Sequence, residues 1–309
     1  MKICIFSNPN GRKVKRHLGT LITELSGLEG YEHLVTTKET DIAKLISGRA
    51  WATEDLVVIN GGDGTAQRVF SAFLNLEIAN LPRFALLPGG TTNMTASCYN
   101  RSRSYKSALR TLRIRIVARD TEHFSARYLV EVTTGTGVLY GAFFGAGLIV
   151  QGIQFCHDYV YKTGMRSEIG AGIALARAAW GIARKQAPFS NPTAVQIDEY
   201  PELPMLILLV SSLDKLFLGM RPFWGKENGA LHLTSIMQGA VQFLRRLPRI
   251  MKGGKYATAL SRAEGYESRN TDRVHLDFDG PFTIDGELFE TQGAPLLVSS
   301  SRVIGVLSL

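Results

Sequence analysis

The chain has 309 residues, and its 35 lysines and arginines against 27 aspartates and glutamates give a net charge of +8. A composition that is 45% hydrophobic and 20% charged excludes an intrinsically disordered chain, and the length predicts one large domain or two ordinary ones. The longest clean apolar run, Met205–Val210, is far shorter than the roughly 20 residues of a membrane-spanning helix. The positive charge is compatible with nucleic acid, an anionic membrane surface or a phosphorylated substrate.

The first third of the sequence alternates between strand-like and helix-like segments. The predicted strands are Lys2–Ser7, Tyr31–Thr36, Asp55–Asn60 and Arg83–Leu87, and the predicted helices are Val14–Leu25, Asp41–Ala50 and Ala66–Leu74. This order predicts a parallel sheet with helices on its faces, in which binding groups follow the carboxyl ends of the strands.

A different pattern follows a predicted basic helix at Ser104–Arg113. The predicted strands there are Ala126–Thr134, Gly137–Phe144, Thr193–Ile197, Leu203–Val210, Gly229–Ser235, Arg273–Phe278, Phe282–Ile284 and Leu296–Leu307, and Glu168–Lys185 is a predicted helix. We therefore expect an α/β protein in which a mostly antiparallel, β-rich second domain follows the parallel sheet, with a boundary near residue 120.

A glycine-rich loop, Gly61–Thr65, separates the predicted strand Leu56–Asn60 from a helix that opens with Ala66 and Gln67. Glycines let backbone N–H groups converge on an oxyanion, and the following helix contributes the positive end of its dipole. Asp63 would repel phosphates unless a cation such as Mg²⁺ lay between them. The alternative interpretation of Asp63 is a helix-capping residue in a tight turn.

A second loop of this type, Pro88–Asn93, follows the next predicted strand and offers Gly90, Thr91 and Asn93 as phosphate-binding residues. The order of a parallel sheet would place the two loops side by side. Neither loop matches the GxxxxGK[ST] or GxGxxG fingerprint, which argues against those two nucleotide-binding folds.

These loops resemble those of the diacylglycerol kinase catalytic family, which includes bacterial lipid kinases and the sphingosine and ceramide kinases. The resemblance extends to Asn8-Pro9-Asn10-Gly11, to Thr36, and to Ile284-Asp285-Gly286-Glu287. It implies a nucleotide-binding domain of residues 1–120 completed by a C-terminal strand at about residues 300–309. A lipid-substrate domain of residues 121–299 would follow, with ATP and the lipid between the two. The residues that it implies for nucleotide binding are Asn8, Thr36, Gly61, Gly62, Asp63, Gly64, Thr65, Gln67, Gly90, Thr91 and Asn93.

The Asp285-Gly286 pair lies between apolar runs and is by itself a hairpin-turn signal. The resemblance implies a catalytic role for Asp285, as the base that accepts the proton of the lipid hydroxyl. It makes Glu287 the metal-binding or orienting partner, so that Asp63 and Glu287 are the expected Mg²⁺ ligands. A second Asp-Gly pair at Asp279 is followed by proline and suits a structural turn better.

Two departures from the family pattern affect its metal sites. Met94 follows Asn93, where the family usually has an aspartate. In the segment Trp224–Gly229, Gly225 and Asn228 replace two carboxylates that hold a structural Mg²⁺ in many bacterial members. Because hard cations require anionic oxygens, we expect no structural Mg²⁺ at this segment.

Positive charge is concentrated in Arg101–Arg119 and Phe243–Lys255, and apolar residues interleave with the charges of the second segment. This pattern is typical of an interfacial segment on an anionic membrane, although a solvated helix face is an alternative. Nucleic acid is not an expected partner, because no nucleic-acid-binding signature accompanies the charge. The N-terminus lacks the features of a secretory signal, which predicts a cytoplasmic protein. The basic segments predict that it associates peripherally with a membrane.

The leading hypothesis is therefore a lipid kinase that uses ATP and Mg²⁺ to phosphorylate diacylglycerol or a related lipid. An NAD kinase-like enzyme shares the Gly-Gly-Asp-Gly loop, but the second loop and the late Asp-Gly-Glu argue against it. A catalytically weak nucleotide- or lipid-binding regulator is the alternative that Met94 and the missing carboxylates suggest.

Overall fold

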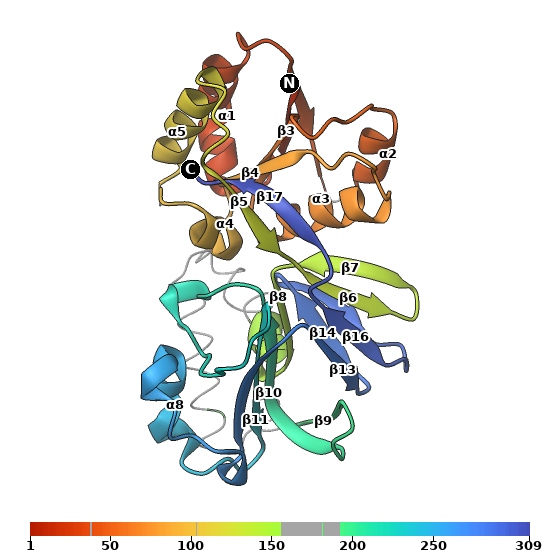
Figure 1. Cartoon of the computed structure of the whole chain (residues 1–309), viewed down its shortest axis with the longest axis vertical. Coiled ribbons are helices and arrows are strands. Elements are labelled where there is room, and N and C mark those ends of the chain that lie inside the picture. Colours follow the sequence, from red (N-terminus) through yellow and green to blue (C-terminus); the bar gives the residue numbers. More distant parts are fainter. Residues whose placement is uncertain (38, 103, 156–180, 182–191) are drawn as a thin grey trace. The chain divides into compact units, whose positions relative to one another are not determined.

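The structure is a computed structural model that describes residues 1–37, 39–102, 104–155, 181 and 192–309 (Figure 1). The chain forms two compact units, of which the first comprises Met1–Tyr128 with Val303–Leu309 and the second Leu129–Arg302. The predicted helix Glu168–Lys185 lies outside the described residues, apart from Gly181. Arg103 of the first basic segment also lies outside them.

In the part of the first unit that the structure describes, six strands form one sheet in the order β2-β1-β3-β4-β17-β5. The strands are β1 (Ile3–Ser7), β2 (Tyr31–Val35), β3 (Leu56–Gly61), β4 (Arg83–Pro88), β5 (Phe124–Tyr128) and β17 (Val303–Leu307). All neighbouring pairs are parallel except β17 and β5. The carboxyl ends of β1, β3 and β4 therefore meet at one edge of the sheet.

Helices cover both faces of this sheet. They are α1 (Arg12–Leu25), α2 (Ile42–Ser47), α3 (Asp63–Asn75), α4 (Met94–Tyr99) and α5 (Tyr105–Val117). Figure 1 shows α1 and α5 together on one side and α2 and α3 on the other. Leu21 of α1 and Leu112 of α5 share a core with Ile5, whereas the ring of Phe73 in α3 packs against those of Phe6 and Phe84. Burial on both faces explains why these strands are continuous apolar runs.

The described strands of the second unit form an antiparallel sheet of 11 strands. They are β6 (Val130–Thr134), β7 (Gly137–Gly141), β8 (Phe143–Gly147), β9 (Thr193–Ile197), β10 (Leu203–Ser211), β11 (Leu231–Met237), β12 (Tyr266–Thr271), β13 (Arg273–Asp277), β14 (Pro281–Ile284), β15 (Glu287–Glu290) and β16 (Leu296–Ser299). The described helices are α6 (Leu148–Phe155) and α8 (Phe243–Lys252), with 3-10 turns η3 (Phe217–Gly219), η4 (Gly254–Tyr256) and η5 (Arg262–Glu264). A largely parallel sheet and a large antiparallel sheet together confirm the predicted fold class.

Two segments predicted as single strands each cross from one unit to the other. Ala126–Thr134 divides into β5 and β6, and Leu296–Leu307 divides into β16 and β17. The two crossings are adjacent, because the N–H of Leu129 donates a hydrogen bond to the carbonyl oxygen of Arg302 at 3.1 Å. Leu129 alone separates β5 from β6, so the sequence pattern does not mark the first crossing, whereas the polar residues Ser300–Arg302 separate β16 from β17. The first unit accordingly extends along the chain to Tyr128, whereas the sequence pattern placed the boundary near residue 120.

Candidate active site

The first glycine-rich loop joins β3 to α3 and presents the N-terminus of that helix. Gly62 precedes the helix without a side-chain cap, and Asp63 is its first residue, whereas the sequence predicted a start at Ala66. A Cβ atom on Gly61 would lie 2.6 Å from the side chain of Thr65, so this position excludes larger residues. Uncapped N–H groups at a helix N-terminus are suited to binding an anion.

The second loop lies in backbone contact with the first. The N–H of Gly89 donates to the carbonyl oxygen of Gly61 at 2.9 Å, and a Cβ atom on Gly90 would lie only 2.4 Å from Cα of Gly62. Asn93 closes the second loop on itself: its Oδ1 accepts from the N–H of Gly90 at 2.7 Å, and its Nδ2 donates to the carbonyl oxygen of Gly90 at 2.9 Å. Both glycine loops therefore form one rigid edge.

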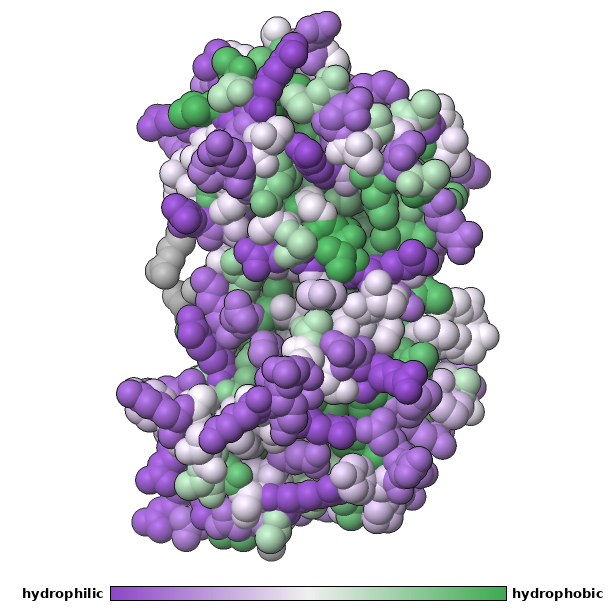
Figure 2. All heavy atoms as spheres, viewed as in Figure 1, coloured by the Kyte–Doolittle hydropathy of each residue, from purple (hydrophilic) through white to green (hydrophobic). Residues whose placement is uncertain are grey.

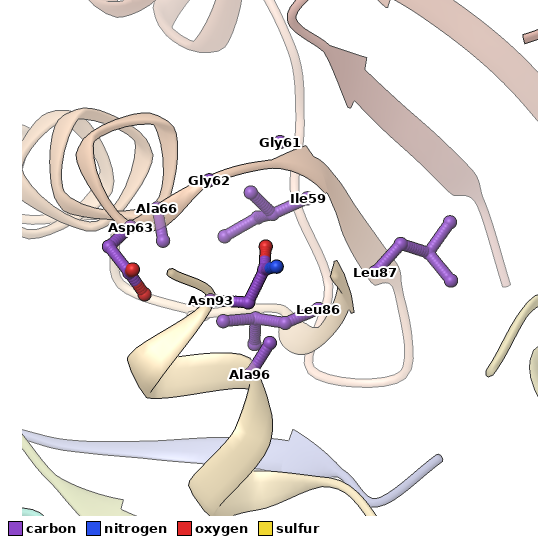
Figure 3. A pocket seen from close by; sticks show the side chains of 9 residues that line it. All are labelled: Ile59, Gly61, Gly62, Asp63, Ala66, Leu86, Leu87, Asn93 and Ala96. Atoms are coloured by element: carbon purple, nitrogen blue, oxygen red, sulfur yellow. The ribbon is translucent and has the colours of Figure 1, made fainter. Parts of the chain in front are cut away.

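Asp63 connects this edge to the short helix α4. Its Oδ2 accepts from the N–H of Met94 at 3.0 Å and its Oδ1 from the N–H of Thr95 at 2.9 Å, while Asn93, at the N-cap of α4, makes no side-chain cap. Asp63 thus caps α4 from the neighbouring loop, and Figure 3 shows its carboxylate directed toward that helix. Burial raises the pKa of Asp63 above its ordinary value, although the hydrogen bonds from Thr95 and Met94 act to lower it.

A cavity of about 10 Å³ lies between the loops (Figure 3). Its lining residues are Ile59, Gly61, Gly62, Asp63, Ala66, Leu86, Leu87, Asn93 and Ala96. This volume has room for one water molecule at most. The space between the loops is therefore too small for a phosphate group.

The loop after β1 completes the edge. Asn8 donates from Nδ2 to Thr65 Oγ1 at 3.2 Å, and its own N–H donates to the carbonyl oxygen of Asn60 at 3.0 Å. A Cβ atom on Gly11 would lie 3.1 Å from the carbonyl oxygen of Gly89. The structure thus brings together the three loops that follow β1, β3 and β4.

Two of the predicted nucleotide-binding side chains are buried and hydrogen-bonded within the first unit. Thr36 is buried, and its N–H and Oγ1 donate to the carbonyl oxygen of Ser7 at 2.8 and 3.3 Å. Gln67 is buried in α3 and donates from Nε2 to Ser71 Oγ at 3.2 Å. Thr91 lies exposed in the second loop, and Gly64 is half-buried in the first turn of α3.

A buried polar network, which sequence reasoning missed, lies at the ends of β1 and β3, next to the loops that follow these strands. Asn60 donates from Nδ2 to Ser7 Oγ at 2.8 Å and accepts from the hydroxyl of Tyr105 at 2.8 Å. His33 Nε2 lies 2.8 Å from the same Ser7 Oγ, and burial lowers the pKa of His33. The available signal was Asn60, a single amide that ends an otherwise apolar strand.

In the second unit, Asp285 and Gly286 form the two-residue turn between β14 and β15. Both have positive φ, 51° and 91°, as a type I′ turn requires. The buried Asp285 carboxylate accepts from the N–H of Ala142 at 3.0 and 3.2 Å. A Cβ atom on Gly141 would lie 2.7 Å from Asp285 Oδ2, so Gly141 leaves the space that the carboxylate needs. Sequence reasoning identified Asp285 but missed Gly141 and Ala142.

Two further side chains surround this turn. Ser211 is buried and donates from Oγ to the carbonyl oxygen of Ala142 at 2.8 Å. Glu287 is half-buried at the start of β15, and its carbonyl oxygen accepts from Thr283 Oγ1 at 2.9 Å. Across the turn, Glu287 pairs with Ile284, the residue that precedes Asp285.

The donor set limits how a metal ion could be held. Within the described ranges, no group of three or more His, Cys, Asp or Glu residues is placed to bind one. The Asp63 carboxylate already accepts from the N–H groups of Met94 and Thr95, so a Mg²⁺ ion at this edge would have to take most of its ligands from phosphate and water. In the segment Trp224–Gly229, the Nδ2 of Asn270 donates to the carbonyl oxygens of Gly225 and Glu227, at 3.4 and 2.9 Å.

Comparison with known proteins agrees with this geometry. Residues 2–123 match the family model of the diacylglycerol kinase catalytic domain, which confirms the resemblance seen in the sequence. No curated protein sequence matches the chain. One similar solved structure, from Bacillus anthracis strain Sterne, is provisionally assigned as a diacylglycerol kinase. It has a TM-score of 0.71 and 14% sequence identity to this chain, and the match covers 100% of this chain and 95% of that structure's chain. A second structure from the same strain, described as a diacylglycerol kinase, has a TM-score of 0.63 and 14% identity. That match covers 100% of this chain and 97% of the other chain. At this identity the likeness shows a shared fold.

Proposed function

Because residues 2–123 match the diacylglycerol kinase catalytic domain, we propose that the protein is a lipid kinase. It would transfer the γ-phosphate of ATP to a hydroxyl group of diacylglycerol or a related lipid. The observation that carries this proposal is the backbone contact between the two glycine loops at Gly62 and Gly90. That contact holds the second loop beside the N-terminus of α3, which has no side-chain cap and whose dipole favours an anion.

The loops would bind the triphosphate through backbone N–H groups. Such groups need no side chain, and glycine allows phosphate oxygens to approach them closely. Asn8 would orient Thr65 toward the same surface through its 3.2 Å hydrogen bond. A Mg²⁺ ion bound to ATP would neutralise charge on the phosphates, with Asp63 and Glu287 as its proposed protein ligands.

Asp285 is the proposed general base. Phosphoryl transfer depends mainly on positioning and charge neutralisation, and a carboxylate orients the attacking hydroxyl and accepts its proton. The N–H of Ala142 holds this carboxylate in one orientation, and the type I′ turn fixes its backbone. The proton of the acceptor hydroxyl would pass to a carboxylate oxygen of Asp285 as the bond to phosphorus forms.

Met94 does not remove the connection between the second loop and Asp63. Its backbone N–H, which any residue except proline could supply, donates to Asp63 Oδ2. The missing carboxylate therefore affects the metal site more than it affects the loop geometry. A regulator that binds ATP without transferring phosphate is the second candidate, and the following experiment separates it from the enzyme.

The test is incubation of the full chain with labelled ATP and Mg²⁺ and separate panels of diacylglycerol, related lipids and NAD. We expect label in a lipid and a loss of roughly 10²–10⁴-fold in rate for Asp285→Asn, the usual contribution of a general base. Asparagine suits the type I′ turn as well as aspartate does, so this variant changes the charge and not the fold. Asp279→Asn, at the other Asp-Gly turn, is the matched control and should keep its activity.

Each contrary result has a distinct meaning. Full activity of Asp285→Asn would show that another group accepts the proton. Label in NAD would favour the NAD kinase-like alternative. Binding of ATP without transfer to any acceptor would favour the regulator.

A further inference from the structure

The second basic segment combines exposed positive charge with an absence of acidic residues. The sequence between Glu227 and Glu264 contains no aspartate or glutamate. Its lysines and arginines are Arg245, Arg246, Arg249, Lys252, Lys255 and Arg262. Helix α8 and the turn η4 lie within this stretch.

The inner face of α8 contributes to the packing of the second unit. Phe243 and Ile250 are buried in a core cluster with Tyr266 of β12, and Leu247 packs against the same cluster. Arg246 belongs to this side, because it forms an ion pair with Glu264 at 2.6 Å and lies over the ring of Tyr266. Packing therefore accounts for the inner face.

Packing does not account for the outer face. Leu244, Arg245, Pro248, Arg249 and Lys252 are all exposed, and their spacing of three and four residues places them along one stripe of the helix. In Figure 2, the region where α8 lies in Figure 1 has hydrophilic residues interleaved with less polar ones. The stripe therefore contains both cations and apolar groups.

The stripe continues into η4. Gly253, with φ of 58°, lets the chain turn against Arg221, whose carbonyl oxygen would lie 1.7 Å from a Cβ atom at this position. Beyond the turn, the ring of Tyr256 is 53% exposed, and the Nζ atoms of Lys252 and Lys255 both lie 5.4 Å from its centroid. Before the helix, Val241 is 44% exposed. Lysines beside a tyrosine ring and aliphatic residues are typical of membrane interfaces.

Four positively charged side chains of this face lack a carboxylate partner among the described residues. Among the described residues, Arg245, Arg249, Lys252 and Lys255 form no ion pair with a carboxylate. Like charges at helical spacings of three and four residues are destabilising. The helix dipole favours Arg249 and Lys252 in the last turn but disfavours Arg245 in the first. An anionic partner would offset this repulsion.

We propose that the α8 face, defined as Val241, Leu244, Arg245, Arg249, Lys252, Lys255 and Tyr256, docks on membranes that contain anionic lipids. The cations attract the lipid headgroups, and Leu244, Val241 and the Tyr256 ring enter the boundary between headgroups and acyl chains. This inference rests on the proposed function, because a lipid kinase must reach an acceptor that resides in a membrane.

The test is co-sedimentation of the full chain with vesicles of phosphatidylcholine alone and of phosphatidylcholine mixed with phosphatidylglycerol, without ATP. We expect binding to the mixed vesicles only, weakened by added salt. Arg245→Gln/Arg249→Gln should reduce the binding constant about 25-fold, since each basic residue contributes about fivefold near an anionic surface. Lys106→Gln/Arg110→Gln removes the same charge from the exposed side of α5 and should leave binding within about twofold.

Several outcomes would overturn the proposal. They are equal binding to both kinds of vesicle, equal losses in the two double variants, and tighter binding of the wild type to a DNA or RNA duplex than to anionic vesicles. Phosphate transfer to diacylglycerol dispersed in detergent is measured separately. Vesicle binding without any such transfer would contradict the proposed function and leave the docking surface supported.

Discussion

Replacement of Gly90 by alanine tests the contact between the two glycine loops directly. The added Cβ atom would lie 2.4 Å from Cα of Gly62 and 3.2 Å from Oδ1 of Asn93. Non-bonded carbon atoms prefer separations of about 3.5–4.0 Å, so the loops must move apart by roughly 1 Å. Overpacking of this kind costs about 1–3 kcal/mol, and we expect the free energy of unfolding of the first unit to fall by about 2 kcal/mol.

The same displacement should impair nucleotide binding. Because a misplacement of about 1 Å at a site can cost 10²-fold in rate, we expect a large loss of phosphate transfer together with weaker ATP binding. Urea unfolding curves and ATP titrations measure the two effects. Gly19→Ala is the matched control: no atom lies within 4 Å of the added Cβ in α1, and the exchange should stabilise the protein by about 0.5–1 kcal/mol. Wild-type stability and ATP affinity in Gly90→Ala would refute the reasoning.

Three further expectations follow from the described contacts. Gly141→Ala places a Cβ atom 2.7 Å from Asp285 Oδ2, so phosphate transfer should fall by about tenfold or more while ATP binding stays unchanged; equal activity would contradict the assigned position of Asp285. Burial acts to raise the pKa of Asp120, but hydrogen bonds to its carboxylate lower it to about 2. Its ionised form therefore stabilises the fold above about pH 4, and this contribution is lost as the pH falls toward 2, so the urea midpoints of Asp120→Asn and the wild type should differ at pH 7 and converge at low pH. Burial raises the pKa of Cys4 to about 12, so peptide mass spectrometry should find Cys4 labelled by a maleimide at pH 8 only after unfolding; rapid labelling of the native protein would contradict its burial.

The sequence was sufficient for the strands β1 to β4 of the first unit because they lie in a sheet that is covered on both faces. A strand such as Leu56–Gly61 is then an unbroken apolar run, and the glycines that follow it mark the loop. The loop pattern pointed to Asp63 and the family resemblance to Asp285, but neither could determine the partners of these side chains. Asp63 accepts from N–H groups about 30 positions along the chain, and Asp285 from one more than 140 positions away, so no local pattern records either contact.

Other features depend on tertiary pairing alone. The short helix α4 lacks a side-chain cap of its own and is stabilised from Asp63, so its sequence has no start signal. The extended run from Phe124 to Thr134 serves two different sheets, and its pattern continues through Leu129 without interruption. In both cases the deciding interaction comes from a segment far away in the sequence.

The position of β17 has a consequence for how the protein is made. This strand lies between β4 and β5, so the sheet of the first unit has a gap until residues 303–307 are present. During synthesis, the ribosome produces the whole second unit, Leu129–Arg302, before that gap can close. Until then, the edge of β4 that pairs with β17 has no partner strand, and an unpaired edge of this kind can pair with other chains. The second unit is topologically an insertion in the first, so the sheet of the first unit can close only after the second unit has been synthesised.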